Sequence, residues 1–236
     1  MKIFETIKRQ IVMIFYNLKI IFGNKFIYFL LGAVGLFLLI TILNLAQGQV
    51  LSPSDVYGIL MLVGALLLFY PVAFGIQSDK DARTLEIIFG IPDYRFRVWF
   101  MRVLLIYGIT FLFVLLLGFL LKVSLTNFPL FNMAFSVMFP LFFMGFLTFF
   151  LATVTRSGNG TAAIIIIISL VLMMFSSAIQ NSQWNVFFNP WGNTNGTNAM
   201  VWANIVLKNR IFLMAGGVVF MLAALLNLQK REKFLG

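Results

Sequence analysis

Six long stretches without a charged residue constrain the fold of this chain more than any other feature. No Asp, Glu, Lys or Arg occurs at 26–54, 56–78, 103–121, 123–155, 157–207 or 211–229. A helix needs about 20 mostly apolar residues to cross the hydrocarbon core of a bilayer. We therefore expect an all-α membrane protein with six transmembrane helices. The stretches place these spans at about 26–46, 56–77, 101–121, 131–154, 161–180 and 210–229.

The composition argues against a soluble globular protein. Hydrophobic residues make up 61% of the 236 residues and charged residues 10%, whereas soluble domains contain about 25% charged residues. The net charge of +10 comes from basic clusters beside apolar runs. That arrangement favours anchoring beside a membrane over binding a nucleic acid. We expect a single transmembrane domain over residues 1–236 that contacts the lipid bilayer and binds no nucleic acid.

The distribution of basic residues predicts an orientation. Of the 17 Lys and Arg residues, only Lys122, Lys208 and Arg210 fall in one set of alternate loops. The others lie in the N-terminal segment, the 78–102 loop, position 156 and the tail after the last span. Cytoplasmic loops are enriched in Lys and Arg. We therefore expect a multi-pass protein of the cytoplasmic (inner) membrane, with both termini in the cytoplasm and the 181–208 loop outside.

Two segments outside the spans have patterns of their own. In residues 1–25, Ile3, Ile7 and Ile11 recur at helical spacing, which predicts an amphipathic helix in the cytoplasmic interface. An N-terminal extension of the first span is the alternative. The 181–208 segment has too many Asn, Pro and Gly residues for a seventh span. Its tryptophans fit an interfacial belt, so we expect a re-entrant-like outer segment before the last span.

Several kinds of chemistry have no candidate residues. The chain contains no Cys and no His, which removes disulfides, thiolate sites and the usual metal ligand and general base. It also lacks the GxxxxGK phosphate-binding motif. We therefore expect no catalytic, cofactor or metal site, and no enzyme activity in this chain alone. No ionisable residue is expected near the centre of a span, which argues against a proton- or sodium-driven carrier.

The 78–100 loop concentrates acidic residues. Residues 84–89 are predicted to form a short helix with an acidic first turn, ended by Gly90 and Pro92. A second helix is expected to begin at Asp93, as its N-cap, and to continue into the third span. A short helix in a mixed-charge loop is suited to docking on a partner protein. An ordinary solvated connection is the alternative.

This loop resembles a known family. The run DKDARTLEIIFGIPDYR at 79–95 resembles the loop between spans two and three of ABC-2 type permeases. The basic tail at 227–235, the six spans, the N-terminal amphipathic helix and the long outer loop are also similar to that family. Two departures occur. Arg83 stands where glycine is usual, and the pair Asp93 and Tyr94 replaces the usual apolar residue and Ser.

The resemblance implies a transmembrane permease subunit of an ABC transporter, an exporter for an amphipathic or apolar substrate. It would pair with a second permease subunit, the same or a related chain, and with separate ATPase subunits that bind ATP and Mg²⁺. The alternative is a non-transporting membrane anchor or signalling subunit that relays ATPase motion to other proteins. Carried over by position, the residues that would contact the ATPase are Thr84, Leu85, Glu86, Phe89 and Pro92, with Arg156 and Ser157 as a second contact.

Overall fold

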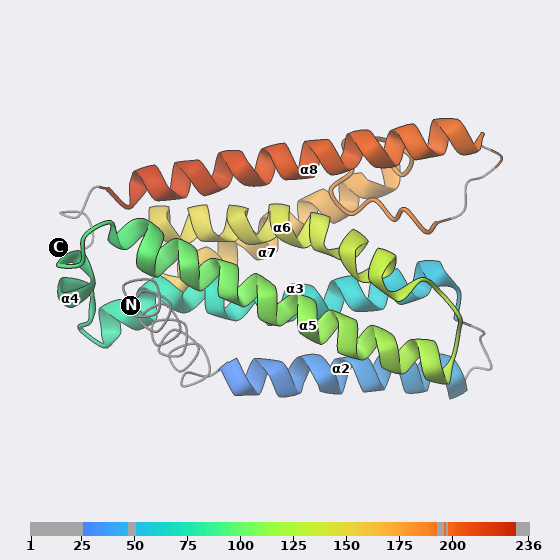
Figure 1. Cartoon of the computed structure of the whole chain (residues 1–236), viewed down its shortest axis with the longest axis horizontal. Helices are drawn as coiled ribbons and strands as arrows, with labels where there is room; N and C mark the ends of the chain where they lie inside the picture. The colour runs from blue at the N-terminus through green and yellow to red at the C-terminus, as the bar shows by residue number, and fades with distance from the viewer. Residues whose placement is uncertain (1–25, 47–50, 193–195, 197, 230–236) are drawn as a thin grey trace, which may run out of the picture.

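The described part of the chain forms long helices that lie side by side along one axis (Figure 1). This computed structural model describes residues 26–46, 51–192, 196 and 198–229. The elements are α2 (Phe26–Ala46), α3 (Pro53–Asp81), α4 (Leu85–Phe89), the π-helix η1 (Arg95–Phe100), α5 (Met101–Ser124), α6 (Leu130–Thr155), α7 (Gly158–Ala178) and α8 (Ala199–Asn227). The amphipathic helix expected in residues 1–25 and the basic tail beyond 229 lie outside the described residues.

The predicted spans correspond to six helices. Within the described ranges, six helices are long and apolar enough to cross a membrane, which indicates a multi-pass membrane protein. The all-α prediction is confirmed at this level, since every element in the described residues is a helix. The first span lies at its expected residues, whereas α3 and the η1–α5 helix extend beyond theirs.

The start of the last span is the main correction. We expected it at residue 210, after a loop over 181–208, but α8 begins at Ala199. The side chain of Asn198 accepts a hydrogen bond from the Met200 N–H at 2.9 Å, as an N-cap does. The uncharged residues after it then continue the helix. The final part of the predicted loop is therefore the first part of α8.

The six long helices alternate in direction along the bundle (Figure 1). α3 and α6 are the most buried of them, and α2 and α7 are the most exposed. The short helix α4 lies at one end of the bundle, on the left in Figure 1. We call this the α4 end and the other the opposite end. The end of α3, the start of α5 and the end of α8 meet at the α4 end.

α6 and α8 run parallel and in register. Near the opposite end, Arg210 Nη2 donates to Ser136 Oγ at 2.9 Å. Near the α4 end, Asn227 Nδ2 donates to the Thr153 carbonyl at 2.8 Å. Both pairs are separated by 74 positions, so the two helices stay level over their whole contact. Small residues between these bonds allow a close approach, because a Cβ on Gly217 would lie 2.5 Å from the Phe142 ring.

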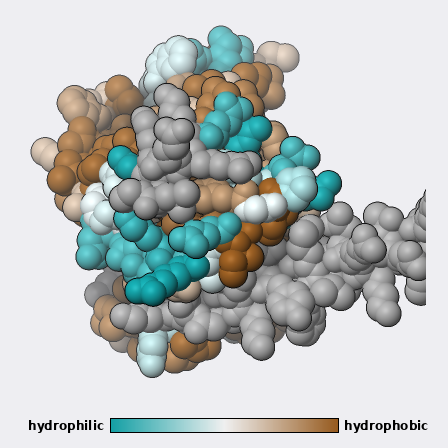
Figure 2. Space-filling model, turned by 90° about the vertical axis from the view of Figure 1, so that its left-hand side faces the viewer, coloured by the Kyte–Doolittle hydropathy of each residue, from teal (hydrophilic) through white to brown (hydrophobic). Residues whose placement is uncertain are grey.

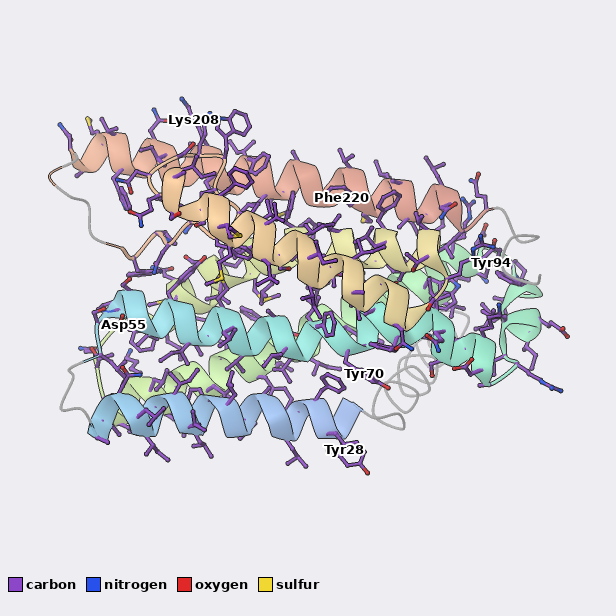
Figure 3. All side chains as sticks on the ribbon, turned by 180° about the vertical axis from the view of Figure 1, so that it is seen from behind. Tyr28, Asp55, Tyr70, Tyr94, Lys208 and Phe220 are labelled. Atoms are coloured by element: carbon purple, nitrogen blue, oxygen red, sulfur yellow. The ribbon has the colours of Figure 1, made fainter. Side chains whose placement is uncertain are left out.

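A column of aromatic rings joins three helices on another side of the bundle. The rings of Phe29 in α2 and Tyr70 in α3 stack at 4.3 Å, and those of Tyr70 and Phe74 at 5.0 Å. Figure 3 shows Tyr70 between α2 and α3. Phe74 in turn packs on Gly158, the first residue of α7, where an added Cβ would lie 2.3 Å from the ring. The column attaches the exposed helices α2 and α7 to the buried α3.

The segment between α7 and α8 folds back on the bundle. The Tyr57 hydroxyl donates to the Phe188 carbonyl at 3.2 Å, and Asn189 Nδ2 donates to Ser54 Oγ at 2.9 Å. Val186 and Phe188 are buried. The described part of this segment is made of turns rather than a seventh span, as expected. It covers the start of α3, and its depth in a bilayer stays a prediction.

Candidate functional site

The loop that carries α4 begins with a tight turn after α3. The carbonyl of Asp79 accepts hydrogen bonds from the backbone N–H of Thr84 at 3.0 Å and from its Oγ1 at 3.1 Å. Arg83 adopts a positive φ of 53° to make this turn. Glycine adopts that conformation at little cost, and other residues do so less readily. Arg83 therefore occupies a position that glycine would adopt with less strain.

The helix α4 is amphipathic. Leu85, Ile88 and Phe89 are buried, at 4%, 8% and 6% exposure. On its other face Glu86 is exposed, and Ile87 has 73% of its surface exposed. Among the residues predicted to contact an ATPase, Leu85 and Phe89 thus pack inside this chain. Glu86 and Ile87 offer the accessible carboxylate and apolar side chain of the helix, and Pro92 is exposed beyond it.

Tyr94 connects the α4 loop to the end of α8. Its ring meets the Phe89 ring edge to face, with centroids 5.1 Å apart. Its hydroxyl donates a hydrogen bond to the Leu228 carbonyl, immediately after α8. Figure 3 shows Tyr94 at this end of the molecule, near the end of α8. Tyr94 is 3% exposed, so a displacement of α4 would act directly on the last helix.

A buried ion pair closes the base of the same loop. Arg102 Nη1 lies 2.7 Å from Asp79 Oδ2, and the two side chains are only 5% and 6% exposed. The guanidinium carbon of Arg102 also lies 4.9 Å from the centroid of the Trp99 ring. Asp79 belongs to α3 and Arg102 to α5, so the pair fixes the two helices that enter and leave the loop. The pair thus joins the two ends of the loop that carries α4.

Neither residue of this pair was a site candidate in the sequence. The signal was present, because Asp79 follows one uncharged stretch and Arg102 precedes the next. Two opposite charges at the facing ends of consecutive spans are well placed to pair. Their separation of 23 positions conceals that proximity. Tyr94 gave no such signal, since its partner is a backbone carbonyl 134 positions away.

The entry into α5 differs from the expected N-cap at Asp93. Asp93 has a positive φ of 54°, and its backbone carbonyl accepts from the N–H groups of Phe96 and Arg97 at 3.0 and 3.1 Å. No side-chain cap bond is found at the start of η1. The helix starts as a π-helix over Arg95–Phe100, a form frequent at functional sites. Asp93 therefore stabilises the start of this helix with its backbone carbonyl and not with its side chain.

The loop at 156–157 lies against the same part of α3. Arg156 ends α6 in the left-handed conformation, with a φ of 56°. Ser157 caps α7, since its Oγ accepts from the Gly160 N–H at 3.3 Å. The backbone N–H of Gly158 donates to Gln77 Oε1 at 2.5 Å, two positions before Asp79. The structure thus brings both predicted contact segments to the last turns of α3, with Arg156 and Ser157 exposed.

The surface of the α4 end is polar and of mixed charge. Figure 2, which views this end, shows hydrophilic residues gathered on it and apolar residues on the flanks. In the described residues, no group of three His, Cys, Asp or Glu side chains could hold a metal ion. The arrangement is suited to binding a protein surface. The exposed charged residues are Lys80, Asp81, Arg83, Glu86, Asp93, Arg97 and Arg156.

Comparison with known proteins adds no relative. No family model matches the chain, and no curated protein and no solved structure matches it either.

Proposed function

We propose that this chain is the transmembrane permease subunit of an ATP-driven ABC transporter, of the ABC-2 type that its loop resembles. The observation that carries the proposal is α4, a short helix with an exposed Glu86 and a buried apolar face at one end of the bundle. The resemblance gives that position to the contact with an ATPase subunit. The permease works as an exporter and pairs with a second copy or a related chain.

The attachments of α4 support a role in transmitting motion. The Asp79–Arg102 pair joins the loop to α3 and α5, and the Tyr94 hydroxyl joins it to the residue after α8. A force applied to α4 would therefore reach three of the six long helices through buried contacts. An ordinary solvated connection would not need such attachments.

The charge distribution supports placing the α4 end in the cytoplasm. In the described residues, this end carries Lys80, Arg83, Arg95, Arg97, Arg102 and Arg156, whereas Lys122, Lys208 and Arg210 lie toward the opposite end. Positively charged residues favour the cytoplasmic side. ATP and Mg²⁺ then bind to a separate cytoplasmic subunit, since the chain carries no phosphate-binding motif. The membrane is the cytoplasmic membrane.

Charge reversal at Glu86 tests the proposal. The carboxylate is exposed and outside the bundle, so Glu86→Arg should leave folding intact while removing a docking charge. Breaking a desolvated interfacial charge pair costs about 2–5 kcal/mol, so association with the ATPase should fall tenfold or more. The measurement is the MgATP hydrolysis that co-purifies with the chain from its native membrane.

The matched control is Lys122→Glu, a charge reversal at an exposed residue near the opposite end. It should leave the co-purified ATPase unchanged. Equal ATPase in Glu86→Arg and the parent would contradict the docking role. A complex that hydrolyses ATP in liposomes but moves no amphiphile would instead favour the anchor or signalling alternative.

A further inference from the structure

Arg210 places a charge within the long helix α8 rather than at its start. The sequence suggested that it lies at the outer edge of the last span. Because α8 begins at Ala199, Arg210 instead lies about 17 Å along the helix axis from its first residue. Its hydrogen bond to Ser136 sets it level with the second turn of α6, about 9 Å below that helix's first residue, Leu130. Because α8 has 29 residues, more than a span needs, the depth of Arg210 in the bilayer stays a prediction.

The charge of Arg210 is only partly balanced. A guanidinium carries five N–H donors, and one hydrogen bond is found, from Nη2 to Ser136 Oγ at 2.9 Å. The guanidinium carbon lies 5.0 Å from the centroid of the Phe139 ring. Within the described residues no carboxylate pairs with it, since the ion pair found there joins Asp79 and Arg102. Charged residues inside membrane spans are rare and usually paired or functional.

Arg210 lines a shallow, open groove along α8, bordered by Phe139 of α6. The groove has a volume of about 720 Å³. All of its other lining residues are apolar, and those on α8 are largely exposed. A single cation therefore faces an otherwise apolar groove that opens sideways from the bundle. The lining residues are Phe139, Leu207, Arg210, Ile211, Met214, Ala215 and Val218.

The groove matches a membrane lipid, because it has one charged end and an apolar remainder. Arg210 lies toward the opposite end, and Met214, Ala215 and Val218 follow it along α8 toward the middle of the bundle. From Arg210 to Val218 the groove spans about 12 Å of helix. An anionic headgroup at Arg210 would therefore direct an acyl chain toward the bilayer centre, as in the leaflet at the opposite end. A second copy of this chain would cover the apolar wall, but its uncharged stretches would leave the cation without an anion.

We propose that this groove is a binding site for an anionic phospholipid of that leaflet, with its phosphate on Arg210 and one acyl chain along Ile211, Met214 and Val218. Basic pockets between transmembrane helices bind anionic headgroups elsewhere on the same physical basis. The site is independent of the docking of an ATPase on α4, because the two lie toward different ends of the bundle.

The test is native mass spectrometry of the purified chain with equimolar phosphatidylglycerol and phosphatidylcholine. The parent should retain phosphatidylglycerol preferentially. Arg210→Gln should reduce that preference about tenfold, the effect of losing a charged hydrogen-bonding partner. Ala215→Phe, which keeps the guanidinium but fills the groove, should also reduce it. Lys208→Gln should not, because Lys208 points away from the bundle on α8 (Figure 3).

Three results would overturn the proposal. The parent could show no preference between the lipids, or Arg210→Gln and Ala215→Phe could both retain it. Lys208→Gln could also lose as much of the preference for phosphatidylglycerol as Arg210→Gln. That result would indicate that the lipid is attracted to any surface cation. A groove covered by a second copy would leave the parent without a lipid preference while Ala215→Phe changed its oligomeric state. If Arg210→Gln does not fold, Ala215→Phe still decides the matter.

Discussion

The Asp79–Arg102 pair determines how the α4 loop is held at the level of single residues. Both side chains are almost fully buried, and they meet at 2.7 Å. Attraction between buried charges offsets the large cost of removing them from water only while both are present. Arg102 also packs on Trp99. The pair is therefore more important for the geometry of the loop than for the net stability of the bundle.

Removing one member of the Asp79–Arg102 pair should destabilise the protein more than removing both. Asp79→Leu leaves Arg102 as an unpaired buried charge and should lower the free energy of unfolding by about 3–5 kcal/mol. The double variant Asp79→Leu with Arg102→Met should recover a large part of that loss. The measurement is thermal or denaturant unfolding of the purified protein in detergent. Additive losses in the double variant would show that the two side chains do not interact.

Asp55 shows how a single residue can change the choice of a control. Figure 3 shows Asp55 at the opposite end, where it could serve as a control for Glu86. In the structure Asp55 closes a capping box with Ser52, accepting from its backbone N–H at 2.9 Å and from its hydroxyl at 2.6 Å. Reversing its charge would destabilise the start of α3. Lys122 is therefore the better control at that end.

At the scale of the elements, α6 and α8 form a close helix pair with a hydrogen bond toward each end. Arg210 and Asn227 donate across it, and Gly216 and Gly217 lie against phenylalanine rings of α6 between them. In a membrane, such small residues promote helix association, since lipid already satisfies apolar surfaces. The contact between α6 and α8 therefore extends from Arg210 to the α4 end.

A methyl group at Gly217 should disturb this contact. Its Cβ would lie 2.5 Å from the Phe142 ring, so Gly217→Ala should destabilise the protein by about 1–3 kcal/mol. The matched control is Gly108→Ala in α5, where no atom lies within 4 Å of an added Cβ. That change should be neutral or stabilise the helix by up to about 1 kcal/mol. Equal unfolding temperatures of the two variants in detergent would contradict the close packing.

The sequence allowed the elements to be predicted better than their ends and contacts. Lack of charge over about 20 residues is a physical requirement of a membrane span, so it located six helices. The start of α8 was missed because Lys208 and Arg210 were taken as the edge of the span, whereas the helix begins at its N-cap Asn198 and contains both charges. In α4 the pattern predicted a helix but not which face is buried, since five residues are too few to show periodicity. The resemblance assigned Leu85 and Phe89 to the ATPase contact by position, although both pack inside the chain.

At the scale of the whole molecule, the proposal places the charged α4 end in the cytoplasm. The chain has no native cysteine, so single cysteines report topology cleanly. Lys122→Cys, near the opposite end, should react with an impermeant thiol reagent in intact cells. Ile87→Cys, on the exposed face of α4, should react only after permeabilisation. The reverse pattern would invert the proposed orientation and place α4 out of reach of any cytoplasmic ATPase.

The central claim is that the exposed face of α4 contacts an ATPase subunit, and site-specific crosslinking from Ile87 tests it most directly. Ile87→Cys, modified with a photoactivatable thiol reagent in native membranes, should give a covalent adduct with a chain that carries the GxxxxGK motif. Lys122→Cys, treated in the same way, should not. If Ile87→Cys gives no such adduct while the parent complex hydrolyses ATP, or if both positions give it equally, α4 is not the coupling helix.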